Sequence, residues 1–485
     1  MSDHLRLWSN STMPLAQNTS KPVTREILLF KRRIPLPSWR DLPLNVYLLL
    51  FFTLGKGFQI TISTLNITYY AHSLGYKPDF IGVLNAMGAI GSLLGAIPIG
   101  LLADRLGRKP VLLVSALLTP LFLAITGLMT VAPLLLGASL LQGVVASAYW
   151  VTNIPILTES SSEQQRVGVL ALNSFLLLGV GALGNLLGGA IPEFVAGILH
   201  VSAASTVPLR WGVLTAALFT LVFGLPLWFL REPKRTLTTT GAPVTENVAP
   251  PQMPNIVLPA LPKDVASTGT SPIRDATTYS DAPAGYQADS SAKEGLPVKL
   301  FAQLLVPDLL FTMGEGSVVA LIQLYFVLRF HLLPGPLGVI FTISGLAGGI
   351  FSLTSPLFVK RWGKLRLITF VQYVSAPLMI LIGFAPSIWL AIGGEYTRSL
   401  LRTLIDPIYA AFAMEKVSDR YRATLSGFYS VTWSIGYSIG PTIAGWLQTN
   451  VSLSTSFVFG ASCLLIAPTL LLLFFGRRRQ IAAPV

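Results

Sequence analysis

The chain has 485 residues, of which 52% are hydrophobic and only 11% are charged. A soluble globular protein carries about 25% charged residues, so this composition excludes an ordinary soluble domain. The net charge of +13 is basic. Nucleic-acid-binding proteins display such charge on a polar surface that this chain lacks, so we expect no nucleic-acid partner. The single cysteine excludes an intramolecular disulfide and any metal or cluster site built from several cysteines.

Twelve predominantly apolar runs follow the N-terminal segment, each close to the roughly 20 residues that a helix needs to cross a hydrocarbon core. They lie near residues 43–70, 79–103, 111–130, 132–157, 167–191, 209–230, 302–330, 335–359, 367–385, 388–413, 423–448 and 453–476. The sequence therefore predicts an all-α integral membrane protein with 12 transmembrane helices in a lipid bilayer.

A segment rich in Pro, Ser, Thr, Ala and Gly separates these runs into two sets of six. Such a composition cannot build a core, so we expect a largely disordered linker there. The predicted organisation is an N-terminal tail (1–42), an N-terminal six-helix bundle (43–231), a linker (232–299), a C-terminal six-helix bundle (300–476) and a C-terminal tail (477–485).

The basic residues indicate the orientation. With an even number of spans both termini share one side, and 28 of the 34 Lys and Arg residues fall in segments on that side. The positive-inside rule places such segments in the cytoplasm. We therefore predict a multi-pass protein of the plasma (inner) membrane, with both termini and the linker cytoplasmic.

The two halves are repeats of each other. GLLADRLGR at 100–108 aligns with PLFVKRWGK at 356–364, and the same offset aligns Glu159 with Glu415. FTLGKG at 52–57 aligns with FTMGEG at 311–316. Repeats of this kind form a central pathway between two bundles related by a pseudo-twofold axis.

The segment 100–112 resembles the loop signature G-x-L-A-D-R-x-G-R-K-x-x-L of the major facilitator superfamily. The residues that match include Gly100, Asp104, Arg105, Gly107 and Arg108, between the second and third spans. The resemblance implies the fold of that superfamily and alternating access, with Asp104 and the basic residues latching the cytoplasmic ends of the bundles. A simpler interpretation is a positively charged anchor with a tight glycine turn. The second copy has Lys360 in place of Asp104, which argues against a symmetric latch.

The subfamily stays unassigned. The drug–proton antiporters of the superfamily carry Arg-x-x-Gln-Gly in the fourth span, whereas this chain has Ser139 ahead of Gln142 and Gly143.

Charged residues inside the apolar runs are candidates for substrate binding or coupling, because each costs about 2.5–3.5 kcal/mol at a helix centre unless it has a partner or water. The interpretation rests on six such residues: Lys56, Glu315, Glu395, Arg398, Arg402 and Asp406. The last four form a stripe about 80° wide on the tenth span. All six fall on spans one, seven and ten, which line the pathway in the superfamily.

Two interpretations of these charges stay open. Glu395–Arg398 and Arg402–Asp406 can pair along the helix as a purely structural network. Alternatively, Arg398 or Arg402 holds a substrate group while Glu315 or Glu395 takes up a proton. Lys56 and Glu315 are equivalent positions of the repeat, so a pseudo-twofold axis could bring them together.

The function that these observations favour is a secondary active transporter, a monomer that moves a small-molecule substrate by alternating access. We expect proton coupling and multidrug or metabolite efflux. A non-transporting receptor or scaffold with the same fold is the alternative. No cofactor or metal is expected, and the four scattered histidines give no sign of an enzyme.

Overall fold

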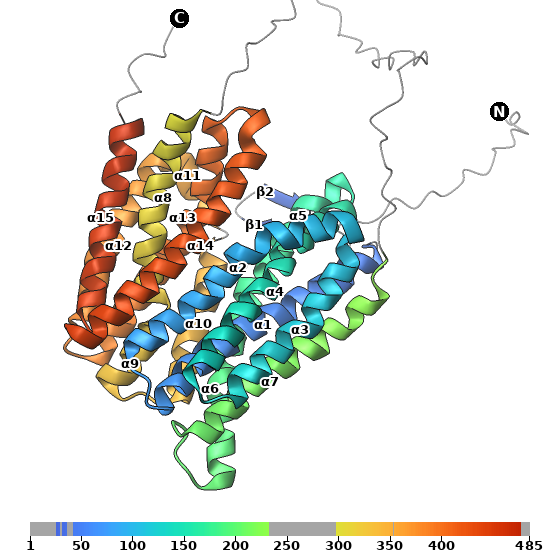
Figure 1. Ribbon diagram of the computed structural model, residues 1–485. Helices are drawn as coiled ribbons and strands as arrows, with labels where there is room; N and C mark the ends of the chain where they lie inside the picture. Colours follow the sequence, from blue (N-terminus) through green and yellow to red (C-terminus); the bar gives the residue numbers. More distant parts are fainter. Residues whose placement is uncertain (1–25, 30–31, 36–41, 232–296, 353, 477–485) are drawn as a thin grey trace, which may run out of the picture. The chain divides into compact units, whose positions relative to one another are not determined.

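The computed structural model describes residues 26–29, 32–35, 42–231, 297–352 and 354–476 (Figure 1). Most of the predicted tails and linker lie outside the described residues. Within the N-terminal tail, strands β1 (Glu26–Leu29) and β2 (Arg32–Pro35) pair antiparallel with Glu26 opposite Pro35. The predicted linker is slightly too long, because helix α8 already begins at Val298.

The N-terminal half contains six spans, as predicted. Five of them are α1 (Leu44–Ser73), α2 (Pro78–Leu106), α3 (Arg108–Leu128), α4 (Ala132–Glu159) and α7 (Thr206–Gly224), the last followed by a 3₁₀ turn, η4 (Leu225–Phe229). The remaining span is irregular, because α5 (Glu163–Ser174) continues through a π turn, η2 (Phe175–Gly179), and a 3₁₀ turn, η3 (Val180–Ala182), into α6 (Leu183–Leu199).

The C-terminal half also covers its six predicted runs with helices. They are α8 (Val298–Val319), α9 (Ile322–Phe330), α10 (Pro334–Ser352), α11 (Ser355–Trp362), α12 (Lys364–Gly383), α13 (Ile388–Lys416), α14 (Asp419–Asn450) and α15 (Thr455–Phe475). The runs at 302–330 and 335–359 are each divided into two helices by a short break, which the hydropathy pattern does not reveal.

Within the described residues, ten helical segments are long and apolar enough to cross a membrane. The other two long helices, α13 and α14, have 29 and 32 residues but a more polar composition. The charged stripe accounts for this difference in α13, where Glu395 and Arg398 are buried inside the protein.

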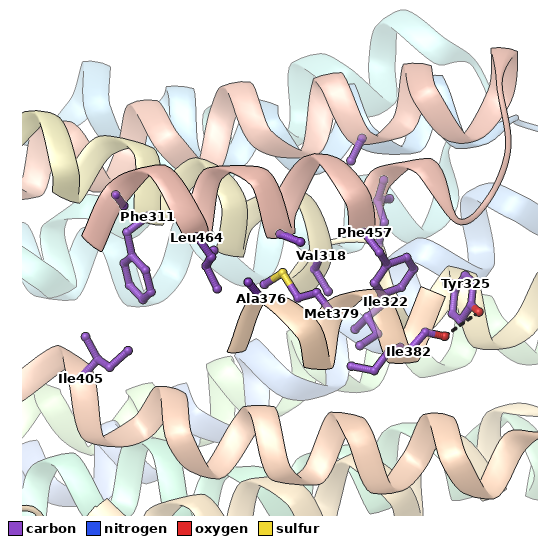
Figure 2. Close-up of a cluster of buried hydrophobic side chains, with 14 of the residues drawn as sticks. Phe311, Val318, Ile322, Tyr325, Ala376, Met379, Ile382, Ile405, Phe457 and Leu464 are labelled. Atoms are coloured by element: carbon purple, nitrogen blue, oxygen red, sulfur yellow. Dashed lines mark hydrogen bonds between the residues drawn. The ribbon is translucent and has the colours of Figure 1, made fainter. Parts of the chain in front are cut away.

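A continuous apolar core holds the C-terminal half together. Phe311 and Val318 of α8 lie near Met379 of α12 and Leu464 of α15 (Figure 2). One of the few polar groups in this core, the Tyr325 hydroxyl, donates a hydrogen bond of 2.9 Å to the Ile382 carbonyl oxygen. This packing fixes α8 against its neighbours and so fixes the position of any residue on its polar face.

Closely spaced glycines let α1 and α8 approach neighbours on two sides. A Cβ on Gly57 would lie 2.6 Å from the Leu177 carbonyl oxygen, and one on Gly55 would lie 2.1 Å from the Phe223 side chain. Successive residues of a helix are rotated by about 100° around its axis. Lys56 therefore points in a direction between those of Gly55 and Gly57, each of which contacts a neighbouring segment.

The same arrangement recurs on α8. Gly314 meets α15, and a Cβ on Gly316 would lie 3.2 Å from the Gly436 carbonyl oxygen of α14. Glu315 lies between these two glycines, as the repeat predicts from FTLGKG and FTMGEG. The glycines therefore explain why each half can enclose a charged residue in the middle of a helix.

Hydrogen bonds join the two halves to each other. The Tyr69 hydroxyl donates to the Leu332 carbonyl oxygen at 2.8 Å, and the Asp79 amide donates to Thr449 Oγ1 at 2.9 Å. Both contacts lie at the side of the bundles opposite to the one where α1 begins and α15 ends. We call the latter the tail side.

Candidate functional site

A buried network of charged side chains joins α8 to α13. Arg398 Nη1 donates to Glu315 Oε2 at 2.7 Å, while Arg398 Nε and Nη2 donate to the two carboxylate oxygens of Glu395 at 2.9 and 3.0 Å. The side chains of Arg398 and Glu315 are each only 2% exposed. Arg398 is therefore the central cation between two carboxylates, and the fork geometry of its guanidinium suits this role.

Arg402 extends the network to α14. Its Nε lies 3.2 Å from Glu315 Oε2, the same oxygen that Arg398 contacts, and its Nη2 donates to the Tyr437 hydroxyl of α14 at 2.8 Å. The side chain of Arg402 is 30% exposed, far more than that of Arg398. Arg402 is thus the most exposed of these four charged side chains.

The structure brings together four of the six predicted site residues. Glu395 and Arg398 pair along α13, and Arg402 contacts Glu315 on α8; the expected pair of Arg402 with Asp406 falls on a side chain outside the described ones. Asp406 lies on α13, and its side chain is outside the described part of the chain. Because Glu315 and Arg398 are 83 residues apart, the sequence pattern could not reveal this pairing.

Lys56 lies apart from this network. Its Nζ donates to Gln59 Oε1 at 2.7 Å and lies 5.9 Å from the centre of the Tyr149 ring. Among the described residues no ion pair joins Lys56 to Glu315, so the suggestion that the pseudo-twofold axis brings the two together does not apply to this conformation. Gln59 in turn donates to Ser63 at 3.2 Å, which extends a polar row along α1.

A second polar cluster lies beside Lys56 in the N-terminal half. Thr53 Oγ1 donates to Asn173 Oδ1 at 2.7 Å, and Asn153 Nδ2 donates to the same oxygen at 3.1 Å. The Tyr149 hydroxyl donates to Thr53 Oγ1 at 3.2 Å. This cluster joins α1, α4 and α5 and holds the Tyr149 ring over Lys56.

Asp308 is a buried carboxylate on α8 that was not among the predicted site residues. Its Oδ2 accepts a hydrogen bond of 2.7 Å from Thr432 Oγ1 of α14. Asp308 lies inside the apolar run at 302–330 and precedes Glu315 by seven residues, which places both on one helix face. That spacing was the signal that could have identified it.

The predicted latch residues lie at the tail side, around the turn between α2 and α3. Gly107 has a φ of +96°, which glycine adopts without strain, and Gly363 has +75° at the equivalent turn of the second half. Arg108 forms an ion pair with Glu159, and Lys364 forms one with Glu415. The internal repeat thus extends to these two matched ion pairs.

Gly100, Asp104 and Arg105 lie on α2, and the last two are exposed in its final turn. Within the part of the chain that the structure describes, no three His, Cys, Asp or Glu side chains gather in a way that could hold a metal ion.

A family model described as the Major Facilitator Superfamily matches residues 47–392 and 304–484. The chain belongs to the major facilitator superfamily. Proteins of this superfamily are membrane transporters rather than enzymes, so the chain is a multi-pass membrane protein with the superfamily's 12-helix fold. Its subfamily is not assigned by this match.

The chain matches curated relatives over short segments only. The chain is 30% identical over 107 residues to the uncharacterized MFS-type transporter YfkF of Bacillus subtilis (strain 168), which is 22% of this chain and 27% of the relative. It is 30% identical over 91 residues to the protein ZINC INDUCED FACILITATOR 1 of Arabidopsis thaliana, which is 19% of this chain and 18% of the relative. The matches thus cover about a fifth to a quarter of these relatives.

Solved structures match over nearly the whole superfamily fold. A nucleoside transporter, NupG, has a TM-score of 0.59 at 14% identity, covering 89% of this chain and 99% of that one. A D-xylose–proton symporter has a TM-score of 0.61 at 15% identity, covering 88% of this chain and 95% of that one. At such identities the likeness shows the fold alone.

Proposed function

We propose that this protein is a proton-coupled secondary transporter that moves a small solute across the plasma membrane by alternating access, in the direction of efflux. Three features support the proposal: the superfamily fold, the charged network on the predicted pathway helices α8 and α13, and the absence of a nucleotide-binding motif from the sequence. Both termini and the linker face the cytoplasm in this proposal, and the protein acts as a monomer.

The observation that carries the proposal is the shared carboxylate of Glu315. One oxygen of this buried side chain contacts both Arg398 and Arg402. A proton bound to Glu315 would remove the charge that holds the two guanidinium groups, whereas Arg398 would keep its two hydrogen bonds to Glu395. Arg402, the more exposed of the two, would lose this contact with a carboxylate and could bind a polar group of the solute in its place. Proton binding and solute binding would thus be linked through one contact, which is the requirement for coupling.

The latch residues have a place in this cycle. Making and breaking contacts at the tail side is the expected consequence of bundles that rock against each other. The ion pairs Arg108–Glu159 and Lys364–Glu415 lie within one half each, so they would brace the ends of each bundle during that motion. Asp104 and Arg105, exposed at the end of α2, would make the contact between bundles in the other state.

Reconstituted liposomes provide the test. Vesicles loaded with the pH-sensitive dye pyranine receive amino acids, sugars, nucleosides, organic acids or cationic drugs in turn, and the internal pH is followed. We expect at least one class to move protons with the unaltered protein and none to do so with Glu315→Gln. Exchange of labelled for unlabelled solute should persist in Glu315→Gln, since exchange needs no net proton movement.

The matched control is Asp79→Asn, which neutralises a carboxylate in the first turn of α2, away from the network. It should leave proton movement unchanged. Accumulation of solute by Glu315→Gln against a pH gradient would remove this residue from the coupling role. Absence of flux for every class, together with a signalling partner bound to the linker, would favour the receptor or scaffold alternative.

A further inference from the structure

Lys56 is a buried cation in the middle of a membrane-spanning helix. It follows the first residue of α1 by 12 positions, about 18 Å along the helix axis, and it is only 4% exposed. A buried ammonium group is costly unless an opposite charge or several hydrogen-bond acceptors compensate for the lost water. Lys56 therefore requires compensating groups around its ammonium.

The contacts of Lys56 are neutral. An ammonium group has three N–H donors, and one of them reaches Gln59 Oε1 at 2.7 Å. The face of the Tyr149 ring, with its centre 5.9 Å away, supplies a weak attraction for the cation. Neither contact carries a full negative charge.

The N-terminal half offers no internal carboxylate among its described side chains. Its described carboxylates are found toward helix ends or in exposed turns: Asp79, Asp104, Glu159 and Glu193. The repeat explains this lack. With the offset that aligns Glu159 with Glu415, the positions of α4 equivalent to Glu395, Arg398 and Arg402 are Ser139, Gln142 and Ala146, which are all uncharged.

The two halves are thus unequal at equivalent positions. On α8, Glu315 receives two arginines from α13, while on α1 the equivalent Lys56 receives no anion from α4. We propose that Lys56, with Gln59 beside it, is an anion-binding subsite, and that the solute carries a carboxylate or phosphate group that Lys56 binds. The identity of this anion as the transported solute rests on the proposed function, whereas its binding at Lys56 does not.

The test compares each anion with its uncharged counterpart. Purified protein in detergent is heated with benzoate or benzamide, succinate or succinamide, and AMP or adenosine, and with inorganic phosphate as a further anion. A ligand that binds the folded state raises the Tm. We expect at least one anion to raise the Tm and its uncharged counterpart to have no such effect. The carboxylate and phosphate members of the panel separate the two chemical classes.

Three variants connect this effect to Lys56. Lys56→Gln should weaken binding of the stabilising anion about 10-fold or more, as expected when a charged hydrogen-bonding group is removed from a buried contact. Lys56→Arg, which keeps the charge, should retain part of the effect. Lys77→Gln, which removes an exposed lysine just before α2, should bind as the unaltered protein does. Elution of all variants as a single peak in size-exclusion chromatography shows that they fold.

The outcomes are distinct. If no anion shifts the Tm, or if the shift persists unchanged in Lys56→Gln, the proposal is wrong, and Lys56 is a lysine held as a neutral amine or a purely structural group. Binding in detergent needs no gradient. Anion binding that depends on Lys56 would therefore stand even if Glu315→Gln still coupled transport to protons, which would refute only the proposed coupling.

Discussion

Replacement of Arg398 by Gln tests the charged network most directly. Arg398 makes three hydrogen bonds of 2.7 to 3.0 Å to two carboxylates that are almost fully buried. Without it, Glu315 keeps the contact with Arg402, whereas Glu395 loses both of the hydrogen bonds that the structure assigns to its oxygens. Removal of one partner from a buried ion pair costs about 3–5 kcal/mol, because the remaining charge has no compensation. We expect Arg398→Gln to lower the free energy of unfolding by about this amount.

The double variant Glu395→Gln/Arg398→Gln shows whether the cost arises from the charge left behind. It removes the uncompensated carboxylate. We therefore expect its loss in the free energy of unfolding to be smaller, by about 1–3 kcal/mol, than the sum of the losses in the two single variants. The measurement is unfolding of the purified protein by SDS in mixed micelles, followed by tryptophan fluorescence. A loss below about 1 kcal/mol in Arg398→Gln, or simple additivity in the double variant, would refute the reasoning.

Three further predictions concern packing and exposed charges. Gly57→Ala should lower the free energy of unfolding by about 1–3 kcal/mol, because its Cβ would lie 2.6 Å from a backbone oxygen of the neighbouring turn. Gly197→Ala, with open space around its Cβ, should change it by less than about 1 kcal/mol, and equal effects in the same SDS titration would contradict this account. Glu159→Gln should cost at most about 1 kcal/mol, since its side chain is 45% exposed; a larger loss in the thermal melt would mean that its pair with Arg108 is more than a surface contact.

Hydropathy and the internal repeat predicted most of this fold. The apolar runs correspond to the long helices, since a helix is the only single segment that satisfies its own backbone groups in lipid. The same pattern could not show the breaks within the seventh and eighth runs or the π turn between α5 and α6. The break before α11 coincides with a proline at the start of that helix, a local signal that hydropathy does not encode.

The sequence by itself identified six charged residues inside the apolar runs, because charge and apolar context are both local properties, but Asp308 was not among them. It also determined that Lys56 and Glu315 are equivalent positions, each enclosed by glycines. Only the tertiary structure decided their partners. Glu315 contacts Arg398 and Arg402 because the long side chains of these two residues of α13 reach it on α8, and Lys56 remains with Gln59 because α4 brings no carboxylate to it. Such pairings join residues far apart in the chain, so they follow from how the helices pack and not from the spacing along any one helix.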